Sequence, residues 1–254
     1  MAYRGNVALV TGAGSGMGQL MARRLAAQGA NVAAVDIDER GLAATSMRAP
    51  TITAYPCDVT DAEAVSLVVK RVEDDIGPID RVVNAAGIAP AGAMLEQSAE
   101  TILRVMAVNY GGTVNVTKAA LPGMVERGRG DVINFASLAG WVPVPNLGAY
   151  NASKFAVVAF SEVLAFECAD SGVRFVCVCP PAVDTPMLDQ FAGVKLFQYA
   201  KSISPAAVLD AIEAGIEDGD LFVFPGRGSR FVWRLRRFAP QRVWSNLGRI
   251  ERRA

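Results

Sequence analysis

Short runs of apolar residues alternate with stretches of helical periodicity along most of the chain. Most of the short runs are apolar throughout, which is typical of strands buried on both faces of a sheet. These runs predict strands over 6–10, 31–36, 52–55, 79–84, 131–136, 173–179 and 221–224. The periodic stretches predict helices over 16–28, 61–76, 96–126, 150–169 and 205–218. The alternation indicates an α/β fold: a doubly wound parallel sheet of about seven strands with helices on both faces.

Residues 227–254 differ in pattern from the rest of the chain, because they form two amphipathic helical stretches on either side of Pro240. Each stretch carries one apolar stripe at helical spacing: Phe231, Leu235 and Phe238, then Val243, Leu247 and Ile250. The segment holds nine arginines and one acidic residue, Glu251, and so carries +8, whereas residues 1–226 carry −8. We therefore expect a single main domain over 1–226 and a basic amphipathic helical extension over 227–254.

Three partners compete for this extension: a protein surface, an anionic membrane and nucleic acid. Its charge favours docking on the acidic body or on a neighbouring subunit, closing over a substrate mouth. The same arginines and aromatic rings also suit a peripheral membrane contact. Nucleic acid is not expected, because the chain has no recognisable binding module and its acidic body would repel phosphate. A homodimer or homotetramer is the expected assembly.

The composition excludes several classes of protein. With 52% hydrophobic and 20% charged residues, the chain is globular rather than disordered. It contains no histidine, which excludes Ser-His-Asp hydrolases, Cys-His proteases and zinc sites that need imidazole. Cys177 and Cys179 share one face of a predicted strand and are interpreted as core residues, so that no metal site is expected.

We expect a cytoplasmic protein, with peripheral membrane contact as the alternative. Four cysteines in 254 residues suit a reducing compartment rather than a disulfide scaffold. The first residues show no signal-peptide pattern. The uncharged run over 132–153 contains prolines and asparagines and is therefore not predicted to span a membrane.

A glycine-rich loop joins the first predicted strand to the first predicted helix. It has the pattern Thr-Gly-x-x-x-Gly-x-Gly over 11–18 rather than Gly-x-Gly-x-x-Gly. Glycines let the backbone approach a pyrophosphate, and the helix start offers free N–H groups. The loop therefore predicts a dinucleotide site that includes Gly12, Ser15, Gly16, Met17 and Gly18. A simple tight turn is the alternative, but four alternate glycines are entropically costly for a turn alone.

Asp36 ends the second predicted strand and is followed by Ile37. Its carboxylate can accept hydrogen bonds from the adenine-ribose hydroxyls, whereas it would repel a 2′-phosphate. The sequence thus favours NAD over NADP. Two alternatives stay open: Arg40 leaves NADP possible, and Asp36 could instead be the N-cap of a helix that begins near Asp38.

Tyr150 and Lys154 stand four residues apart, and therefore lie on one face of a predicted helix. A neighbouring cation stabilises phenolate and should lower the pKa of the Tyr150 hydroxyl towards the working range of a general base. Ser137 follows the strand before this helix, at the carboxyl edge where α/β sheets bind ligands. The three residues together predict a catalytic group.

With these residues in place, residues 4–226 resemble the short-chain dehydrogenase/reductase family. The matching pieces are Thr11–Gly18, Asp36, Cys57-Asp58-Val59, Asn84-Ala85-Ala86-Gly87, Asn109, Ser137, Tyr150, Lys154 and Pro180–Met187. The resemblance implies a Rossmann-type sheet and a nicotinamide cofactor. Hydride would pass between the nicotinamide ring and the carbon bearing the oxygen, while Tyr150 moves the proton.

The resemblance also implies a role for each matched residue. Ser137 would hold the substrate oxygen, Lys154 would bind the nicotinamide ribose, and Asn109 would anchor a water of the proton relay. The remaining cofactor contacts would come from Asp58, Val59, Asn84, Ala85, Ala86, Gly87, Pro180, Val183 and Thr185. Three alternatives remain: Asn109 as a helix-bend residue, Asn84 as a stabiliser of the central sheet, and Thr185 as a turn residue.

One departure from the family pattern concerns the loop beside the expected nicotinamide site. The family usually has Pro-Gly there, and this chain has Pro180-Pro181. Proline fixes φ near −65° and removes an N–H donor. We expect cofactor binding to survive, because Val183 and Thr185 lie downstream, and the shape of the active site to change.

Residues after the strand ends predict an apolar substrate pocket with no charge to pair a charged substrate. Its expected walls are Leu138, Trp141, Leu147, Pro181, Met187 and Phe191. The sequence thus predicts an NAD-dependent oxidoreductase acting on the CH–OH group of a hydrophobic secondary alcohol, or on the matching ketone, of steroid- or lipid-like character. The alternative is an NAD(H)-binding redox sensor without turnover, which would have no chemical need for the catalytic residues.

Overall fold

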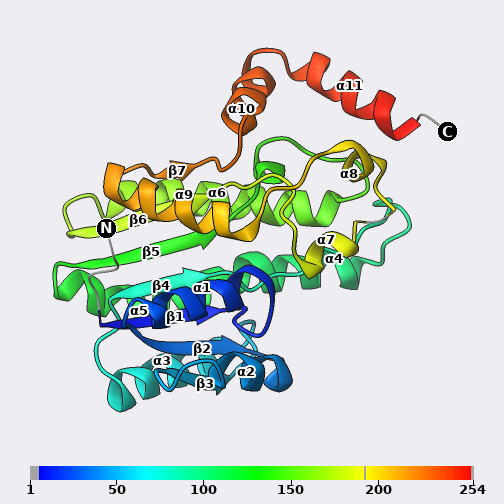
Figure 1. The fold of residues 1–254 in the computed structure, drawn as a ribbon. Coiled ribbons are helices and arrows are strands. Elements are labelled where there is room, and N and C mark those ends of the chain that lie inside the picture. The colour runs from blue at the N-terminus through cyan, green and yellow to red at the C-terminus, as the bar shows by residue number, and fades with distance from the viewer. Residues whose placement is uncertain (1–5, 192, 253–254) are drawn as a thin grey trace.

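The computed structural model describes residues 6–191 and 193–252, and its centre is one parallel sheet (Figure 1). The strand order is β3-β2-β1-β4-β5-β6-β7, and every neighbouring pair is parallel. The strands are β1 Val7–Thr11, β2 Asn31–Asp36, β3 Ile52–Pro56, β4 Arg81–Asn84, β5 Gly130–Phe135, β6 Val173–Val178 and β7 Phe222–Val223. The predicted seven-stranded doubly wound sheet is therefore confirmed. Because the order reverses between β1 and β4, the sheet opens a crevice at the carboxyl ends of these two strands, where α/β folds bind ligands.

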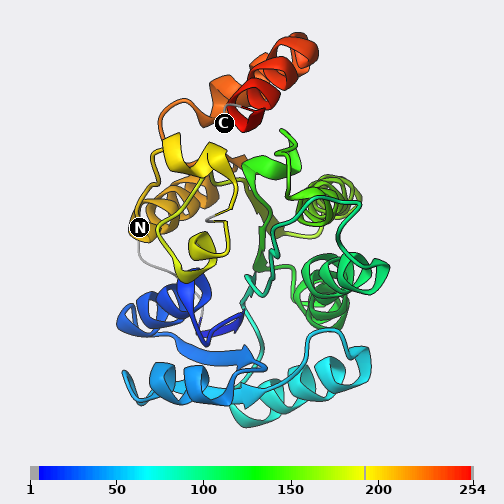
Figure 2. The same cartoon turned by 90° about the vertical axis from the view of Figure 1, so that its right-hand side faces the viewer.

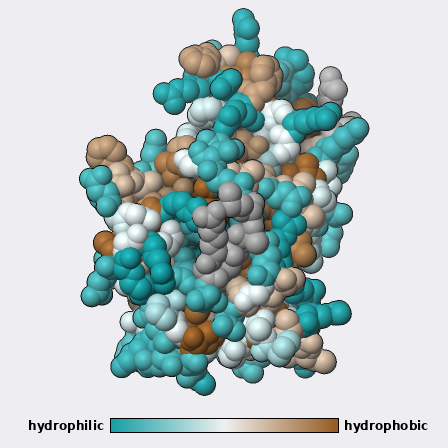
Figure 3. All heavy atoms as spheres, turned by 60° about the vertical axis from the view of Figure 1, so that its left-hand side comes forward, coloured by the Kyte–Doolittle hydropathy of each residue, from teal (hydrophilic) through white to brown (hydrophobic). Residues whose placement is uncertain are grey.

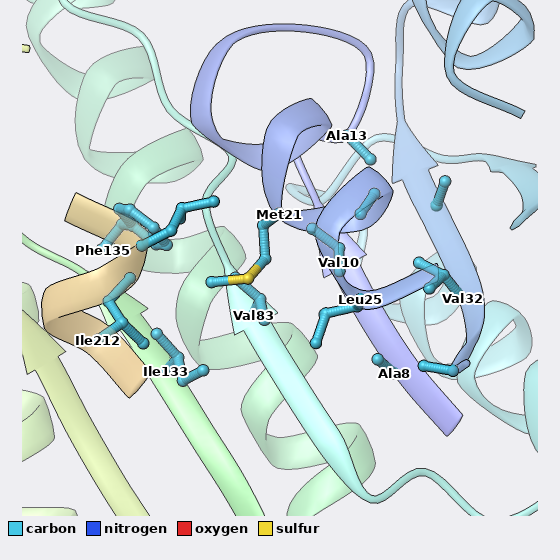
Figure 4. Close-up of a cluster of buried hydrophobic side chains, with 14 of the residues drawn as sticks. Ala8, Val10, Ala13, Met21, Leu25, Val32, Val83, Ile133, Phe135 and Ile212 are labelled. Atoms are coloured by element: carbon cyan, nitrogen blue, oxygen red, sulfur yellow. The ribbon is translucent and has the colours of Figure 1, made fainter. Parts of the chain in front are cut away.

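Helices cover both faces of this sheet (Figure 2). One face carries α1 Gly16–Ala27, α2 Glu39–Ser46 and α9 Pro205–Asp218, and the other carries α3 Ala62–Asp75, α5 Gly112–Glu126 and α6 Gly148–Glu167. Each face has its own apolar core. Met21 and Leu25 of α1 meet Ile212 of α9 and the sheet residues Val83 and Ile133 in the first core (Figure 4). The second core joins α3 and α5 to the opposite sheet surface.

The helix predicted over 96–126 is interrupted. It consists of α4 Ala99–Met106, a π-helical turn η1 Ala107–Gly111, and α5. A π turn adds one residue to a helical turn and is a common device at functional sites. The apolar periodicity continues through it, which is why the sequence alone indicated one helix. The consequence of the interruption is local: it changes the direction in which residues of η1 point.

The described part of the chain contains four helices for which no residue range was predicted from the sequence: α2 and three short ones. The short ones are η2 Leu138–Gly140, α7 Pro186–Asp189 and α8 Lys195–Tyr199, all in loops at the carboxyl edge of the sheet. Asp38 is the N-cap of α2, because its side chain accepts a hydrogen bond from the Arg40 backbone N–H. The N-cap alternative for Asp36 is therefore wrong, and the capping carboxylate is Asp38.

The basic extension forms two helices, α10 Ser229–Phe238 and α11 Pro240–Arg252, which lie beyond the sheet (Figure 1). Trp233 of α10 packs on the body, with its ring centroid 5.1 Å from that of Phe224 and 5.7 Å from that of Trp141. In α11, Val243 is buried. The Glu251 carboxylate accepts a hydrogen bond of 2.9 Å from the backbone N–H of Leu196 in α8.

The two apolar stripes predicted for this extension differ in their surroundings. The second stripe, Val243, Leu247 and Ile250, faces the body as expected. The first stripe does not: Phe231, Leu235 and Phe238 are exposed, and the packed face of α10 is formed by Val232 and Trp233 instead. No described helix has both the length and the apolar character that a membrane span needs.

Candidate active site

The glycine loop runs from the end of β1 into α1 and is shaped by close backbone approaches. Gly12 has a φ of +65°, and a Cβ on it would lie 2.8 Å from the backbone nitrogen of Ala86. A Cβ on Gly18 would collide with the carbonyl of Gly12. Both positions therefore require glycine, and a simple tight turn would require glycine there too. What points to an anion site is therefore the start of α1, which comes directly after the loop.

The start of α1 leaves its backbone donors available. Ser15 is the N-cap residue but its side chain makes no capping hydrogen bond, and the first turn of α1 holds no acidic residue. An uncapped helix N-terminus offers N–H groups and partial positive charge to an anion. This end of α1 thus has the chemistry that a pyrophosphate needs.

A cavity of about 400 Å³, hereafter the loop cavity, lies against this helix start. It gathers residues from the ends of β1, β2, β3 and β4, as expected of the carboxyl edge of the sheet. Its lining includes the following predicted cofactor residues: Gly12, Ser15, Gly16, Met17, Gly18, Asp36, Ile37, Asp58, Val59, Ala85, Ala86, Gly87 and Thr185. The residues present therefore fit the adenosine and pyrophosphate parts of a dinucleotide in position and chemistry.

Asp36 is held in place by backbone donors at the rim of the loop cavity. Its Oδ2 accepts a hydrogen bond of 2.8 Å from the Gly14 N–H, and its Oδ1 accepts one of 2.9 Å from the Asp38 N–H. Each carboxylate oxygen still has a free acceptor site for a hydroxyl. A Cβ on residue 14 would lie 2.9 Å from Asp36 Oδ2, so glycine at this position lets the backbone approach the carboxylate closely.

Tyr150 and Lys154 occupy the first turns of α6, with their side chains buried beneath the end of β5. Ser137, the first residue beyond Ala136 at that strand end, hydrogen-bonds with the Tyr150 side chain. The Lys154 Nζ donates a hydrogen bond of 2.6 Å to the Phe135 carbonyl and lies 5.6 Å from the centroid of the Tyr150 ring. The structure thus brings the predicted serine, tyrosine and lysine together.

Burial governs the pKa values of this group. Burial raises the pKa of Tyr150 to about 12, and the hydrogen bond with Ser137 opposes this only in part. Burial also lowers the pKa of Lys154 to about 8. The expected lowering of the Tyr150 pKa towards neutral pH is not found in the protein by itself, because burial is the largest influence and Lys154 is not among the groups that shift this pKa. Tyr150 is consequently a protonated acid at neutral pH.

Asn109 lies in the middle of the π-helical turn η1 and is completely buried. Its side chain accepts a hydrogen bond of 2.8 Å from the Ile88 N–H and donates to the Ile88 carbonyl and to Ser153 Oγ at 3.0 and 2.9 Å. A Cβ on Gly87 would lie 3.2 Å from Asn109 Oδ1 and 3.8 Å from Lys154 Nζ. Asn109 therefore joins the loop after β4 to α6 beside Lys154, rather than bonding to its own helix as the bend alternative required.

A second cavity of about 380 Å³, hereafter the apolar cavity, has Ser137, Tyr150 and Lys154 in its lining. It shares Met17, Ala85, Gly87, Thr185 and Met187 with the loop cavity, so the two adjoin. Five predicted pocket residues line it: Leu138, Leu147, Pro181, Met187 and Phe191. Pro180 and Val183, predicted to contact the cofactor, also line this cavity and not the loop cavity.

Besides Asn109, which is buried behind Gly87 and lines neither cavity, two more predicted site residues lie outside the cavity linings. Trp141 is not in the lining; its ring packs against Phe222, and its Nε1 donates a hydrogen bond of 3.2 Å to Cys179 Sγ. Asn84 is also outside both cavities, because its Nδ2 donates to Thr117 Oγ1 at 3.0 Å and to Asn134 Oδ1 at 2.8 Å. The geometry of Asn84 favours the alternative in which it stabilises the centre of the sheet.

The apolar cavity also has walls that the sequence did not indicate. They come from α8, from the segments around it and from the extension: Val144, Leu196, Phe197, Ala200, Val232 and Leu247. Val232 and Leu247 belong to α10 and α11, so the extension closes one side of the cavity. The amphipathic pattern and charge of 227–254 were the signal for Val232 and Leu247: they predicted an extension that docks and closes over a substrate mouth, but not which of its residues line the cavity. Among residues 6–191 and 193–252, no group of three or more acidic or cysteine side chains could hold a metal ion.

The comparisons with known proteins agree with this geometry. The sequence profile described as short chain dehydrogenase matches residues 6–193. Probable oxidoreductase EphD of Mycobacterium tuberculosis (strain H37Rv) is 43% identical over 181 residues, which cover 69% of this chain and 31% of EphD. The match thus spans about a third of EphD. 2-(S)-hydroxypropyl-CoM dehydrogenase 3 of Xanthobacter autotrophicus is 37% identical over 195 residues, covering 75% of this chain and 76% of that protein.

A solved structure extends the similarity across nearly the whole chain. The short chain dehydrogenase/reductase of Burkholderia phymatum, crystallised in complex with NAD, superposes with a TM-score of 0.86 at 26% identity. The superposition covers 95% of this chain and 96% of that one. The profile match, the identity to a dehydrogenase over three quarters of both chains and this fold agree with one another. The chain belongs to the short-chain dehydrogenase/reductase family.

Proposed function

We propose that this chain transfers a hydride between NAD(H) and an apolar secondary alcohol or ketone. The observation that carries the proposal is the position of Tyr150, whose side chain sits in the lining of the apolar cavity next to the loop cavity. A nicotinamide bound across the two cavities would give or accept the hydride. The family match supports oxidoreductase chemistry, and the lining supports the class of substrate.

The proton is moved by this chain's own residues. Tyr150 is protonated at neutral pH because burial raises its pKa to about 12, so it can give its proton to a carbonyl oxygen during reduction. Ser137 interacts with the Tyr150 hydroxyl, and its own hydroxyl would hold the same substrate oxygen. Lys154, fixed by the Phe135 carbonyl, places a cation beside the tyrosine ring when it is protonated. Asn109 would position a water that returns a proton to Lys154 after Lys154 has passed one on towards Tyr150.

The apolar cavity selects the substrate by exclusion. Among its described lining residues, Lys154 is the one charged side chain, and the remaining walls are mostly aliphatic or aromatic. A carboxylate or phosphate group would lose its hydration there without a partner, which is costly. A panel of apolar secondary alcohols with NAD, followed by NADH absorbance, tests the proposed function. Oxidation of none of them, together with tight NADH binding, would support the redox-sensor alternative instead.

The cofactor preference rests on Asp36. Its carboxylate oxygens can accept hydrogen bonds from ribose hydroxyls and would repel a 2′-phosphate. We expect the dissociation constant for NADH to be at least tenfold lower than that for NADPH, a difference of about 1.4 kcal/mol. Asp36→Asn should reduce this ratio, and Arg40→Gln, the matched control, should leave it unchanged. Equal affinities in the wild type, or a response to Arg40→Gln alone, would favour NADP.

The size of the substrate should depend on Leu247, because this residue of α11 lines the apolar cavity. We expect Leu247→Trp to lower kcat/KM for the bulkiest substrate of the panel about tenfold or more, and to change it little for the smallest substrates. Leu235→Trp, on the exposed face of α10, is the matched control. The measurement is kcat/KM against substrate length. A uniform loss for all substrates would mean that Leu247 does not bound the substrate site.

The cellular context and the assembly are part of the proposal. All four cysteines are free thiols, three of them buried, which suits the proposed cytoplasmic location. A homodimer or homotetramer is proposed as the working form, to be checked by light scattering.

A further inference from the structure

Helix α10 presents two different apolar faces. Val232 and Trp233 face the body, and Trp233 stacks on Phe224. On the opposite side lie Phe231, Leu235 and Phe238, hereafter the outer stripe, which are 66%, 37% and 83% exposed. At about 100° per residue, these three positions fall on one side of the helix. The outer stripe is therefore not used to hold the extension on the protein.

Arginines border the outer stripe. Arg230, Arg234 and Arg237 are exposed on α10, and Arg242 and Arg249 are exposed on α11. At helical spacing, the first three fall beside the outer stripe rather than opposite it. Trp244 of α11 adds a half-exposed indole. The space-filling view shows apolar side chains next to hydrophilic ones at the top of the molecule, where Figure 1 places α10 and α11 (Figure 3).

The charge of the extension indicates what covers the outer stripe. Exposed apolar patches of this kind mark interaction sites. A two-fold contact between copies through the stripe would place the same patch against itself. It would therefore bring two segments of +8 together, with one acidic residue in each. A surface of negative charge with an apolar interior matches both properties of α10 and α11.

We propose that α10 and α11 form a peripheral membrane-binding surface that selects anionic lipids. The outer stripe would enter the boundary between headgroups and acyl chains, and the flanking arginines would contact lipid phosphates. Val232 and Leu247, on the inward side of the same helices, line the apolar cavity. The membrane would thus lie against the wall of the substrate site. The proposal does not depend on the reaction that the chain catalyses.

Co-sedimentation of the full chain with vesicles tests this surface. We expect binding to vesicles of phosphatidylglycerol and phosphatidylcholine, and little binding to phosphatidylcholine alone. Arg234→Gln with Arg237→Gln should weaken binding to the anionic vesicles by roughly 30-fold at low salt, and added salt should weaken binding of the wild type. Phe231→Ser with Phe238→Ser should weaken it at least tenfold.

The matched controls are exposed residues outside α10 and α11. Phe166→Ser removes an apolar ring that is 84% exposed on α6, and Arg48→Gln removes an exposed charge; neither should change vesicle binding. All variants should keep the wild-type rate on a small dissolved alcohol without lipid, so a failure of the proposed function would be seen separately. Absence of vesicle binding by the wild type would overturn the proposal. So would a fall in molecular mass on Phe231→Ser with Phe238→Ser, which would identify a second copy as the partner.

Discussion

Tyr150→Phe should lower the turnover number by at least ~10² while NADH still binds. The substitution keeps the aromatic ring that lines the apolar cavity and removes only the hydroxyl that hydrogen-bonds with Ser137. General acid–base catalysis by a positioned side chain contributes ~10²–10⁴ to a rate, so its loss should appear in kcat rather than in cofactor affinity. The measurement is steady-state turnover on the best substrate of the panel, together with NADH binding by fluorescence.

Tyr55→Phe is the matched control for this prediction. Tyr55 lies on β3, at the edge of the sheet, and is not in the lining of the apolar cavity. Its hydroxyl donates a hydrogen bond of 3.3 Å to Asp75 at the end of α3. Its loss should leave turnover unchanged. If Tyr150→Phe keeps most of the wild-type turnover, another group moves the proton and Tyr150 is not the acid of the reaction.

The sequence predicts well those features whose signals are local. The strand over 31–36 and the helix over 205–218 match the structure residue for residue. The glycine loop and the spacing of Tyr150 and Lys154 are local patterns too. Within one turn of helix or one loop, the covalent geometry alone decides which side chains can meet.

The features that the sequence could not predict depend on contacts between distant segments. Trp141 follows a strand end, as a pocket residue would, yet its ring is drawn into an aromatic cluster with Trp233 of α10. Leu247 enters the apolar cavity only because α11 docks on α8. The charge of the extension predicted docking on the body, but neither segment indicates which side chains it meets there. The pKa of Tyr150 was likewise mispredicted, because burial is a property of the whole fold and not of the spacing to Lys154.

Lys154→Met should damage both cofactor binding and turnover. Methionine preserves most of the buried volume, but the hydrogen bond of 2.6 Å to the Phe135 carbonyl and the cation beside the Tyr150 ring are lost. The proposed hydrogen bond from Lys154 to the nicotinamide ribose would be lost as well. Hydrogen bonds that involve a charged group contribute ~1.5–3 kcal/mol, so the dissociation constant for NADH should rise about tenfold or more. Turnover should fall about 10², since Lys154 is also assigned to the proton relay. Loss of turnover with unchanged NADH affinity would mean that Lys154 does not contact the nicotinamide ribose.

The same variant should change how stability depends on pH. Burial lowers the pKa of Lys154 from 10.5 to about 8 in the folded protein, so between these values the unfolded chain binds more protons than the folded one. The contribution of Lys154 to the free energy of unfolding should therefore rise with pH through this range, by up to ~3 kcal/mol. The thiols of Cys57 and Cys179, whose pKa values are raised by burial, act in the opposite direction in both proteins. Lys154→Met lacks the titrating group and should lose this rise, whereas Lys118→Met, at an exposed position of α5, should retain it. Urea unfolding at pH 7.5 and 9.5 gives the comparison, and parallel curves for wild type and Lys154→Met would mean that the buried ammonium is already compensated by the fold.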